Sequence, residues 1–173
     1  MIRDIVLNEA ARWNVPPAWI FAIIRTESGG NPGSIGRGDC ARGECSYGLM
    51  GIKLSTARGL DPSVTVQELM TPEKNIEIGA MYLAQLRRRF SSPEDVFSYY
   101  KGGHPWATSS PQAKKEAQQA MLAAGQSAVM VATGQYDRRS TLAAEAGMLS
   151  GIPKPVFYIA GFMALIALLR GSL

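Results

Sequence analysis

The stretch Ile23–Pro32, IIRTESGGNP, joins an apolar segment to an acid and then to two glycines. Upstream, Pro16 and Pro17 suit the start of a helix, and residues 18–24 are apolar on every helical face. We therefore expect a buried helix that ends at Glu27. The helix dipole and desolvation both disfavour a charged carboxyl group there, so the pKa of Glu27 should rise toward that of a general acid.

Helical patterns also dominate the rest of the first 125 residues. Apolar residues at helical spacing, together with proline and hydroxyl start signals, predict helices over residues 2–13, 71–90, 92–102 and 112–125. The last of these is rich in alanine, and its shallow apolar face predicts light packing on the domain or on a partner. No stretch resembles a strand, and no internal repeat is visible. The expected fold class is mainly α.

A long wrapped loop is expected over residues 28–51, because eight of the eighteen glycines lie there. This loop carries Cys40 and Cys45, for which a short disulfide and two free thiols are both open alternatives. His104 is the only histidine, so a zinc site lacks ligands, and we expect neither a metal nor another cofactor.

The length of 173 residues suits one catalytic domain followed by a tail. We expect a domain over residues 1–110, an alanine-rich helical extension over 111–150 and a hydrophobic segment over 151–173. Within the last, residues 156–169 contain no charge, which favours a membrane-inserting helix over a buried core helix. The net charge of +4 suits an anionic polymer or surface but is too dilute to indicate a specific nucleic-acid site.

By position alone, Glu27 is better interpreted as an exposed acid at a helix end. The motifs that follow it change this interpretation. SYGLMGI, NIEIGAMYLAQL and YYKGG follow in order, beginning at residues 46, 75 and 99. This series resembles the family 1 (SLT-type) lytic transglycosylases, lysozyme-like enzymes that cut peptidoglycan, over about residues 1–110. The resemblance implies a lysozyme-like fold, related to goose-type lysozyme, ahead of the helical extension and the hydrophobic segment.

The resemblance also implies roles for individual residues. Glu27 would be the sole catalytic acid and base, and Tyr100, or next to it Tyr99, would hydrogen-bond and orient it. Substrate binding would fall on Ser28, Ser46, Gly48, Leu49, Met50, Tyr99, Tyr100 and Lys101. Two departures stand out: Gly51 replaces the glutamine of the family's GLMQ, and Lys101 replaces an asparagine, unless a shifted register puts Tyr100 in the asparagine's place.

The implied reaction is non-hydrolytic. Protonated Glu27 would cleave the bond between N-acetylmuramic acid and N-acetylglucosamine and then help the muramyl hydroxyl close into an anhydro ring. If Asp39 or Glu44 supplied a second carboxylate, the outcome would be hydrolysis, as in goose-type lysozymes. Two non-enzymatic alternatives are a structural virion or envelope protein inactivated by Gly51 and Lys101, and a membrane-tethered peptidoglycan-binding module. Retention of Glu27 favours catalysis.

The N-terminal sequence MIRDIVLNEAARW is charged and amphipathic, unlike a secretory signal, although the substrate lies outside the cytoplasmic membrane. We therefore expect a bacteriophage virion protein that opens the host wall in the periplasm during genome entry. Its expected partners are peptidoglycan strands, a membrane through residues 156–169, and either other virion proteins or further copies of itself.

Overall fold

The computed structural model describes residues 2–132, and this part of the chain is mainly helical, as predicted. Its helices are α1 (Ile2–Trp13), α2 (Pro17–Glu27), α3 (Arg37–Ala41), α4 (Leu54–Arg58), α5 (Val66–Leu69), α6 (Pro72–Arg89), α7 (Pro93–Gly102), the 3-10 helix η1 (Trp106–Thr108) and α8 (Pro111–Ala132). Strands β1 (Ser46–Tyr47) and β2 (Ile52–Lys53) form a short antiparallel hairpin. The expectation that no strand would form was therefore wrong.

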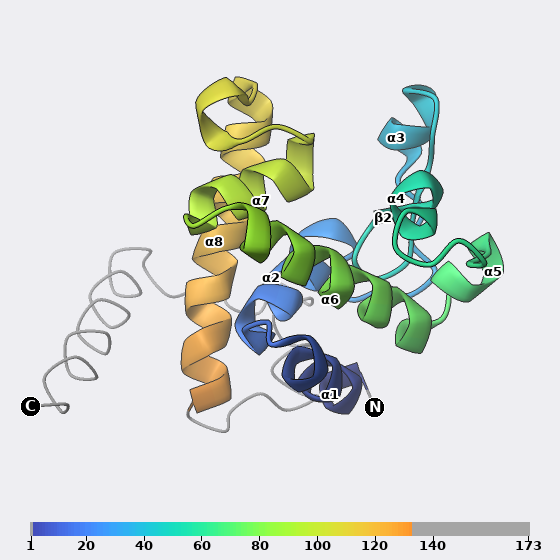
Figure 1. Cartoon of the computed structure of the whole chain (residues 1–173), viewed down its shortest axis with the longest axis horizontal. Helices are drawn as coiled ribbons and strands as arrows, with labels where there is room; N and C mark the ends of the chain where they lie inside the picture. The colour runs from blue at the N-terminus through green and yellow to red at the C-terminus, as the bar shows by residue number, and fades with distance from the viewer. Residues whose placement is uncertain (1, 133–173) are drawn as a thin grey trace, which may run out of the picture.

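Helix α2 lies at the centre of the core. It begins at Pro17 and ends at Glu27, as its sequence predicts, and Ile20, Ala22 and Ile23 are fully buried. Helix α8 packs along α2, and α1 and α6 contact it as well. Figure 1 shows α7 and α8 on one side of the molecule, α3, α4 and α5 on the other, and α6 crossing between them. The end of α2 is thereby fixed by helices from distant parts of the chain.

Helix α8 packs more deeply than its sequence predicts. Its buried face consists of small residues, namely Ala113, Ala117, Ala120, Ala123, Ala124 and Ser127. Alanine exposes little apolar surface, but it lets two helix backbones approach closely, and α8 contacts both α2 and α7 along this face. The helix also continues through Gly125 to Ala132, beyond its expected end.

Two predicted helix starts are confirmed, and a third differs in detail. Ser92 Oγ accepts a hydrogen bond from the Asp95 amide at the start of α7, and Ser110 Oγ accepts one from the Ala113 amide at the start of α8. Thr71 precedes α6, but its hydroxyl donates to the carbonyl oxygen of Glu68 and does not cap the helix. Helix α5 ends just before Thr71, so the Thr71 hydroxyl bonds to the end of α5 and not to the start of α6.

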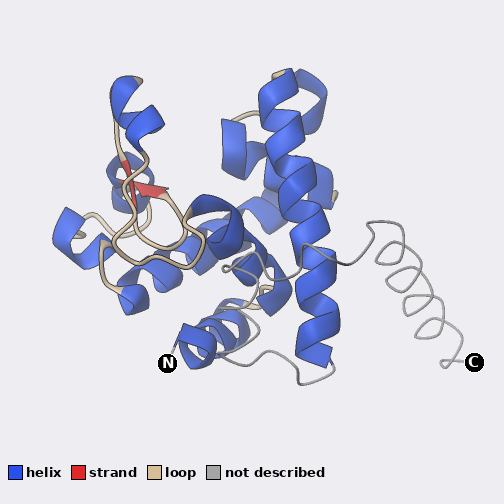
Figure 2. Ribbon diagram, turned by 180° about the vertical axis from the view of Figure 1, so that it is seen from behind, coloured by secondary structure: helices blue, strands red, loops and turns tan. Residues whose placement is uncertain are grey.

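The predicted wrapped loop contains α3 and β1, and Figure 2 shows the hairpin surrounded by loops on this side of the molecule. A disulfide joins Cys40 to Cys45, which decides between the two alternatives for these cysteines. Across residues 2–132, no helix is both long enough and apolar enough to span a bilayer. Residues 156–169, to which the membrane prediction applies, lie outside the described residues.

Candidate active site

Glu27 is the last residue of α2, and Ser28 ties this helix end to the following loop. The Ser28 amide donates to the Ile24 carbonyl oxygen at 3.1 Å, and the Ser28 hydroxyl donates to the Leu49 carbonyl oxygen at 2.7 Å. The Gly30 amide in turn donates to Ser28 Oγ at 3.1 Å. Ser28, predicted as a substrate-binding residue, therefore holds the turn that fixes the position of Glu27.

Two segments far apart in the sequence enclose the Glu27 carboxyl group. From α7, Lys101 Nζ lies 2.5 Å from Glu27 Oε1, and the two side chains are only 7% and 22% exposed. From the hairpin, Gly51 lies so close that a Cβ atom there would be 2.7 Å from Glu27 Oε2. Gly51 also has a φ of +60°, which favours glycine. Glycine is thus needed at residue 51 both by the backbone conformation and by its distance from Glu27.

Burial raises the pKa of the Glu27 carboxyl above its ordinary value. The charge and hydrogen bond of Lys101 act in the opposite direction, whereas the negative charges of Asp39 and Glu116 add to the effect of burial. The net result is a raised pKa, as the sequence predicts. A carboxylic acid that keeps its proton to higher pH suits general-acid catalysis.

Tyr100 supports Glu27 indirectly. Its hydroxyl donates to the Met50 carbonyl oxygen at 2.8 Å and so holds the main chain just before Gly51; the predicted hydrogen bond to Glu27 is absent within residues 2–132. Burial, followed by the charge of Glu27, raises the pKa of Tyr100 well above its usual value. Tyr99 is engaged elsewhere, where its hydroxyl accepts a hydrogen bond from Arg89. The alignment of Tyr100 with the family's tyrosine stays a prediction.

The other predicted cleft residues act mainly through packing and backbone geometry. Leu49 and Met50 are 0% exposed, so their side chains fill the core beneath the site and do not line an open cleft. Ser46 is buried, and its hydroxyl donates to Asp39 Oδ2 at 2.7 Å. At Gly48, with a φ of +74°, an added Cβ atom would clash with the Leu69 carbonyl oxygen. These positions preserve the shape of the hairpin turn.

Asn75 was not predicted as a site residue, yet it organises this turn. It is 1% exposed, and its Oδ1 accepts a hydrogen bond from the Met50 amide at 2.7 Å. Its Nδ2 donates to the carbonyl oxygens of Tyr47 and Leu69 at 2.9 and 2.8 Å. The signal in the sequence was an asparagine beside the apolar face of a strongly predicted helix, where a buried amide needs several partners.

The two acids that could serve as a second carboxylate are both occupied. Asp39 accepts hydrogen bonds from Ser46 and from Arg42, one on each oxygen, and the Glu44 oxygens accept from the amide and the hydroxyl of Ser55. By contrast, no hydrogen bond from residues 2–132 reaches Glu27 Oε2. Glu27 is thus better placed than Asp39 or Glu44 to exchange a proton with a ligand.

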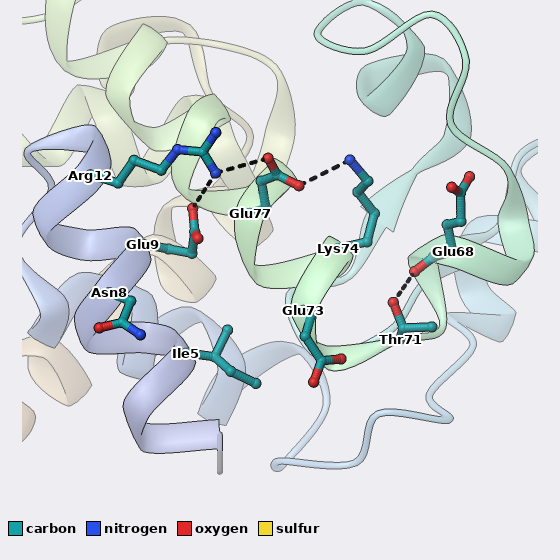
Figure 3. Close-up of a pocket in the computed structure, with 9 residues that line it drawn as sticks. All are labelled: Ile5, Asn8, Glu9, Arg12, Glu68, Thr71, Glu73, Lys74 and Glu77. Carbon is teal, nitrogen blue, oxygen red and sulfur yellow. Dashed lines mark hydrogen bonds and ion pairs between the residues drawn. The ribbon is translucent and has the colours of Figure 1, made fainter.

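A separate groove of about 480 Å³ lies between α1 and α6 (Figure 3). Four of its charged side chains are paired with one another: Arg12 lies 3.7 Å from Glu9 and 3.2 Å from Glu77, and Lys74 lies 2.9 Å from Glu77. Glu27 does not line this groove, which is therefore not part of the candidate active site. Among the described residues, no group of three or more His, Cys, Asp or Glu could hold a metal ion.

Comparison with a solved structure shows a lysozyme-like fold of the kind found in lytic transglycosylases. The chain is similar to an inactive mutant of the lytic transglycosylase Slt from Pseudomonas aeruginosa, with a TM-score of 0.64 and 20% sequence identity. The match covers 75% of this chain and 24% of that protein, so this chain corresponds to about a quarter of its length.

The sequence model of the transglycosylase SLT domain matches residues 4–122. The chain therefore belongs to the transglycosylase SLT domain family. The match extends through much of α8, into the segment predicted as an extension after residue 110, in line with the packing of that helix against α2.

Proposed function

We propose that this chain is a peptidoglycan lytic transglycosylase in which Glu27 serves as both acid and base. The observation that carries the proposal is the environment of Glu27: a buried carboxyl with a raised pKa, positioned by Lys101 through Oε1 and left without a protein partner in residues 2–132 at Oε2. Membership of the transglycosylase SLT domain family supplies the substrate class, the glycan strands of peptidoglycan.

The reaction divides into two proton transfers. Protonated Glu27 donates its proton to the glycosidic oxygen between N-acetylmuramic acid and N-acetylglucosamine as the bond to the anomeric carbon breaks. The resulting Glu27 carboxylate then accepts the proton of a hydroxyl on the same muramyl sugar, whose oxygen closes onto the anomeric carbon. Glu27 ends protonated again, no water is consumed, and the product carries an anhydro-muramyl end.

Digestion of purified peptidoglycan by the wild type and by a Glu27→Gln variant tests this proposal, with mass analysis of the released muropeptides. We expect anhydro-muramyl products from the wild type and none from the variant. Reducing ends would show that the reaction is hydrolysis. Asp39 would then be a better candidate than Glu44 for the second carboxylate, because its charge acts on Glu27. No release from walls of several types would overturn the enzymatic proposal.

We also propose a setting for this activity: local opening of the wall by a virion-associated protein during phage genome entry, with residues 156–169 in contact with a membrane. The support is in the sequence, where an uncharged apolar stretch follows a wall-cleaving domain. Mass spectrometry of purified phage particles from a producing culture should detect the chain at a fixed ratio to capsid protein. Its confinement to the membranes of cells that release no particles would contradict this setting.

A further inference from the structure

Lys101 is unusual in carrying a charge into the candidate active site. Its side chain is 7% exposed, and lysine is rarely buried unless its ammonium group is paired. In the register that aligns Tyr100 with the family's tyrosine, the motif resemblance places a neutral asparagine at this position. The pair with Glu27 therefore introduces a buried cation that the family pattern does not require.

The pairing makes the two oxygens of Glu27 unequal. Lys101 Nζ lies 2.5 Å from Oε1, whereas Oε2 lies against Gly51, whose lack of a Cβ atom avoids a clash with the carboxyl. Two departures from the family motif thus act on the same group: the lysine holds one oxygen, and the glycine keeps a side chain off the other. Glutamine at residue 51 would place its Cβ atom against Oε2.

The charges around Glu27 oppose one another. Lys101 on α7 favours the ionised carboxylate, while Asp39 on α3 and Glu116 on α8 disfavour it. Tyr100, also on α7, adds no charge here, since burial raises the pKa of its hydroxyl well above the usual value. Lys101 is thus the nearest charge that stabilises the carboxylate after the proton has left.

We propose that Lys101 is a positioning residue for the proposed transglycosylase reaction: it fixes Oε1 and directs Oε2 to the sugar. The positive charge beside Oε1 also makes Glu27 a stronger acid than burial alone would. A stronger acid donates its proton more readily to the glycosidic oxygen, and it is also ionised at lower pH. The inference rests on the proposed function, in which Glu27 must be protonated to act. It predicts that Lys101 sets the pH above which activity declines.

The test is the pH dependence of kcat/KM on purified peptidoglycan, which reports the essential acid of the free enzyme. In Lys101→Met, we expect the alkaline limb of the profile to move upward by about one pH unit, because the opposite charge is removed. Lys101→Arg should retain the wild-type limb. Lys115→Met, which removes an exposed positive charge on α8, is the matched control and should leave the profile unchanged. A uniform loss of activity at every pH, with no shift, would overturn the inference.

A second measurement does not require catalysis. Carbon-13 NMR can follow the side-chain carboxyl of Glu27 during a pH titration, with the signal assigned by its loss in Glu27→Gln. The titration midpoint should rise in Lys101→Met and stay near the wild-type value in Lys101→Arg; identical midpoints in the wild type and Lys101→Met would overturn the inference. A shifted midpoint in a protein that does not cleave peptidoglycan would support the pairing of Lys101 with Glu27 and overturn the proposed function.

Discussion

The end of α2 and the loop that carries α3 both place an acid in the region of the candidate site, but in opposite environments. Glu27 is held by an apolar helix, and burial raises its pKa. Partial burial alone would raise the pKa of Asp39 too, but hydrogen bonds from Ser46 and Arg42 and the charges of Lys53 and Arg42 lower it. The Glu27 carboxyl therefore keeps its proton to a higher pH than usual, and the Asp39 carboxyl stays ionised to a lower pH than usual.

This contrast explains how a single acid can be sufficient. Glycosidases that use two carboxylates need one as acid and the other as base or nucleophile. Asp39 has the right charge for the second role, but both its oxygens already accept hydrogen bonds from protein groups. The loop uses its carboxylate to hold its own structure, so the proposed reaction relies on the acid at the helix end alone.

The largest expected effect is the loss of activity on removal of the Glu27 carboxyl, and it tests the contrast between Glu27 and Asp39. Glu27→Gln should lower kcat/KM for peptidoglycan by at least about 100-fold, since general acid–base catalysis typically contributes 10²–10⁴-fold. Asp39→Asn should keep kcat/KM within about tenfold of the wild type, because it removes a charge but not the proton donor. Release of anhydro-muropeptides per unit time measures both rates. Comparable losses in the two variants would make Asp39 a second catalytic acid.

The helical side of this comparison was largely predictable from the sequence. The limits of α2 and the starts of α6, α7 and α8 follow from prolines and hydroxyl residues next to apolar periodicity, which are local signals. The same signals indicated that Glu27 would stand at the end of a buried helix. Its raised pKa follows from that position, and the structure confirms the direction.

The loop side was not predictable, because long-range contacts decide it. Strands β1 and β2 have two residues each, too few for an alternating pattern, and the turn between them is held by Asn75 from α6. The ion pair between Glu27 and Lys101 joins residues 74 positions apart. The deep packing of α8 likewise depends on how closely its alanines approach α2, which periodicity does not encode.

Asn75 joins α6 to the hairpin turn and to the end of α5, and its loss should be the most costly change for folding. Asn75→Ala removes three hydrogen bonds of a buried side chain and leaves the Met50 amide without its partner. We expect the free energy of unfolding to fall by about 3 kcal/mol, measured by urea denaturation. Asn31→Ala, in an exposed part of the loop where a single hydrogen bond is lost, is the matched control and should cost about 1 kcal/mol or less. Equal losses would mean that Asn75 does not hold the hairpin turn to α6.

The disulfide should matter for the loop and much less for the helices. Replacing both Cys40 and Cys45 with serine frees a loop closed over five positions, which we expect to lower the free energy of unfolding by about 2 kcal/mol. Hydrogen exchange should show faster opening of α3 and β1, while the amides of α2 keep their protection. Faster exchange across α2 would contradict this separation of the two regions.

The smallest expected effect concerns pH and distinguishes the two acids by sign. Because the folded state lowers the pKa of Asp39, its stabilising contribution is complete above the unfolded pKa of about 3.9 and is lost as the pH falls through the folded value. Asp39→Asn should therefore cost about 1 kcal/mol at pH 7, with the difference from the wild type shrinking toward zero in acid. The raised pKa of Glu27 has the opposite effect. The contribution of Glu27 to the free energy of unfolding declines as the pH rises from the ordinary pKa of this group to its folded pKa. Urea denaturation of the wild type and the Asp39 variant between pH 2.5 and pH 7, a range chosen to span roughly both values, measures the slope. A difference that stays constant with pH would show that the loop does not stabilise the charged form of Asp39.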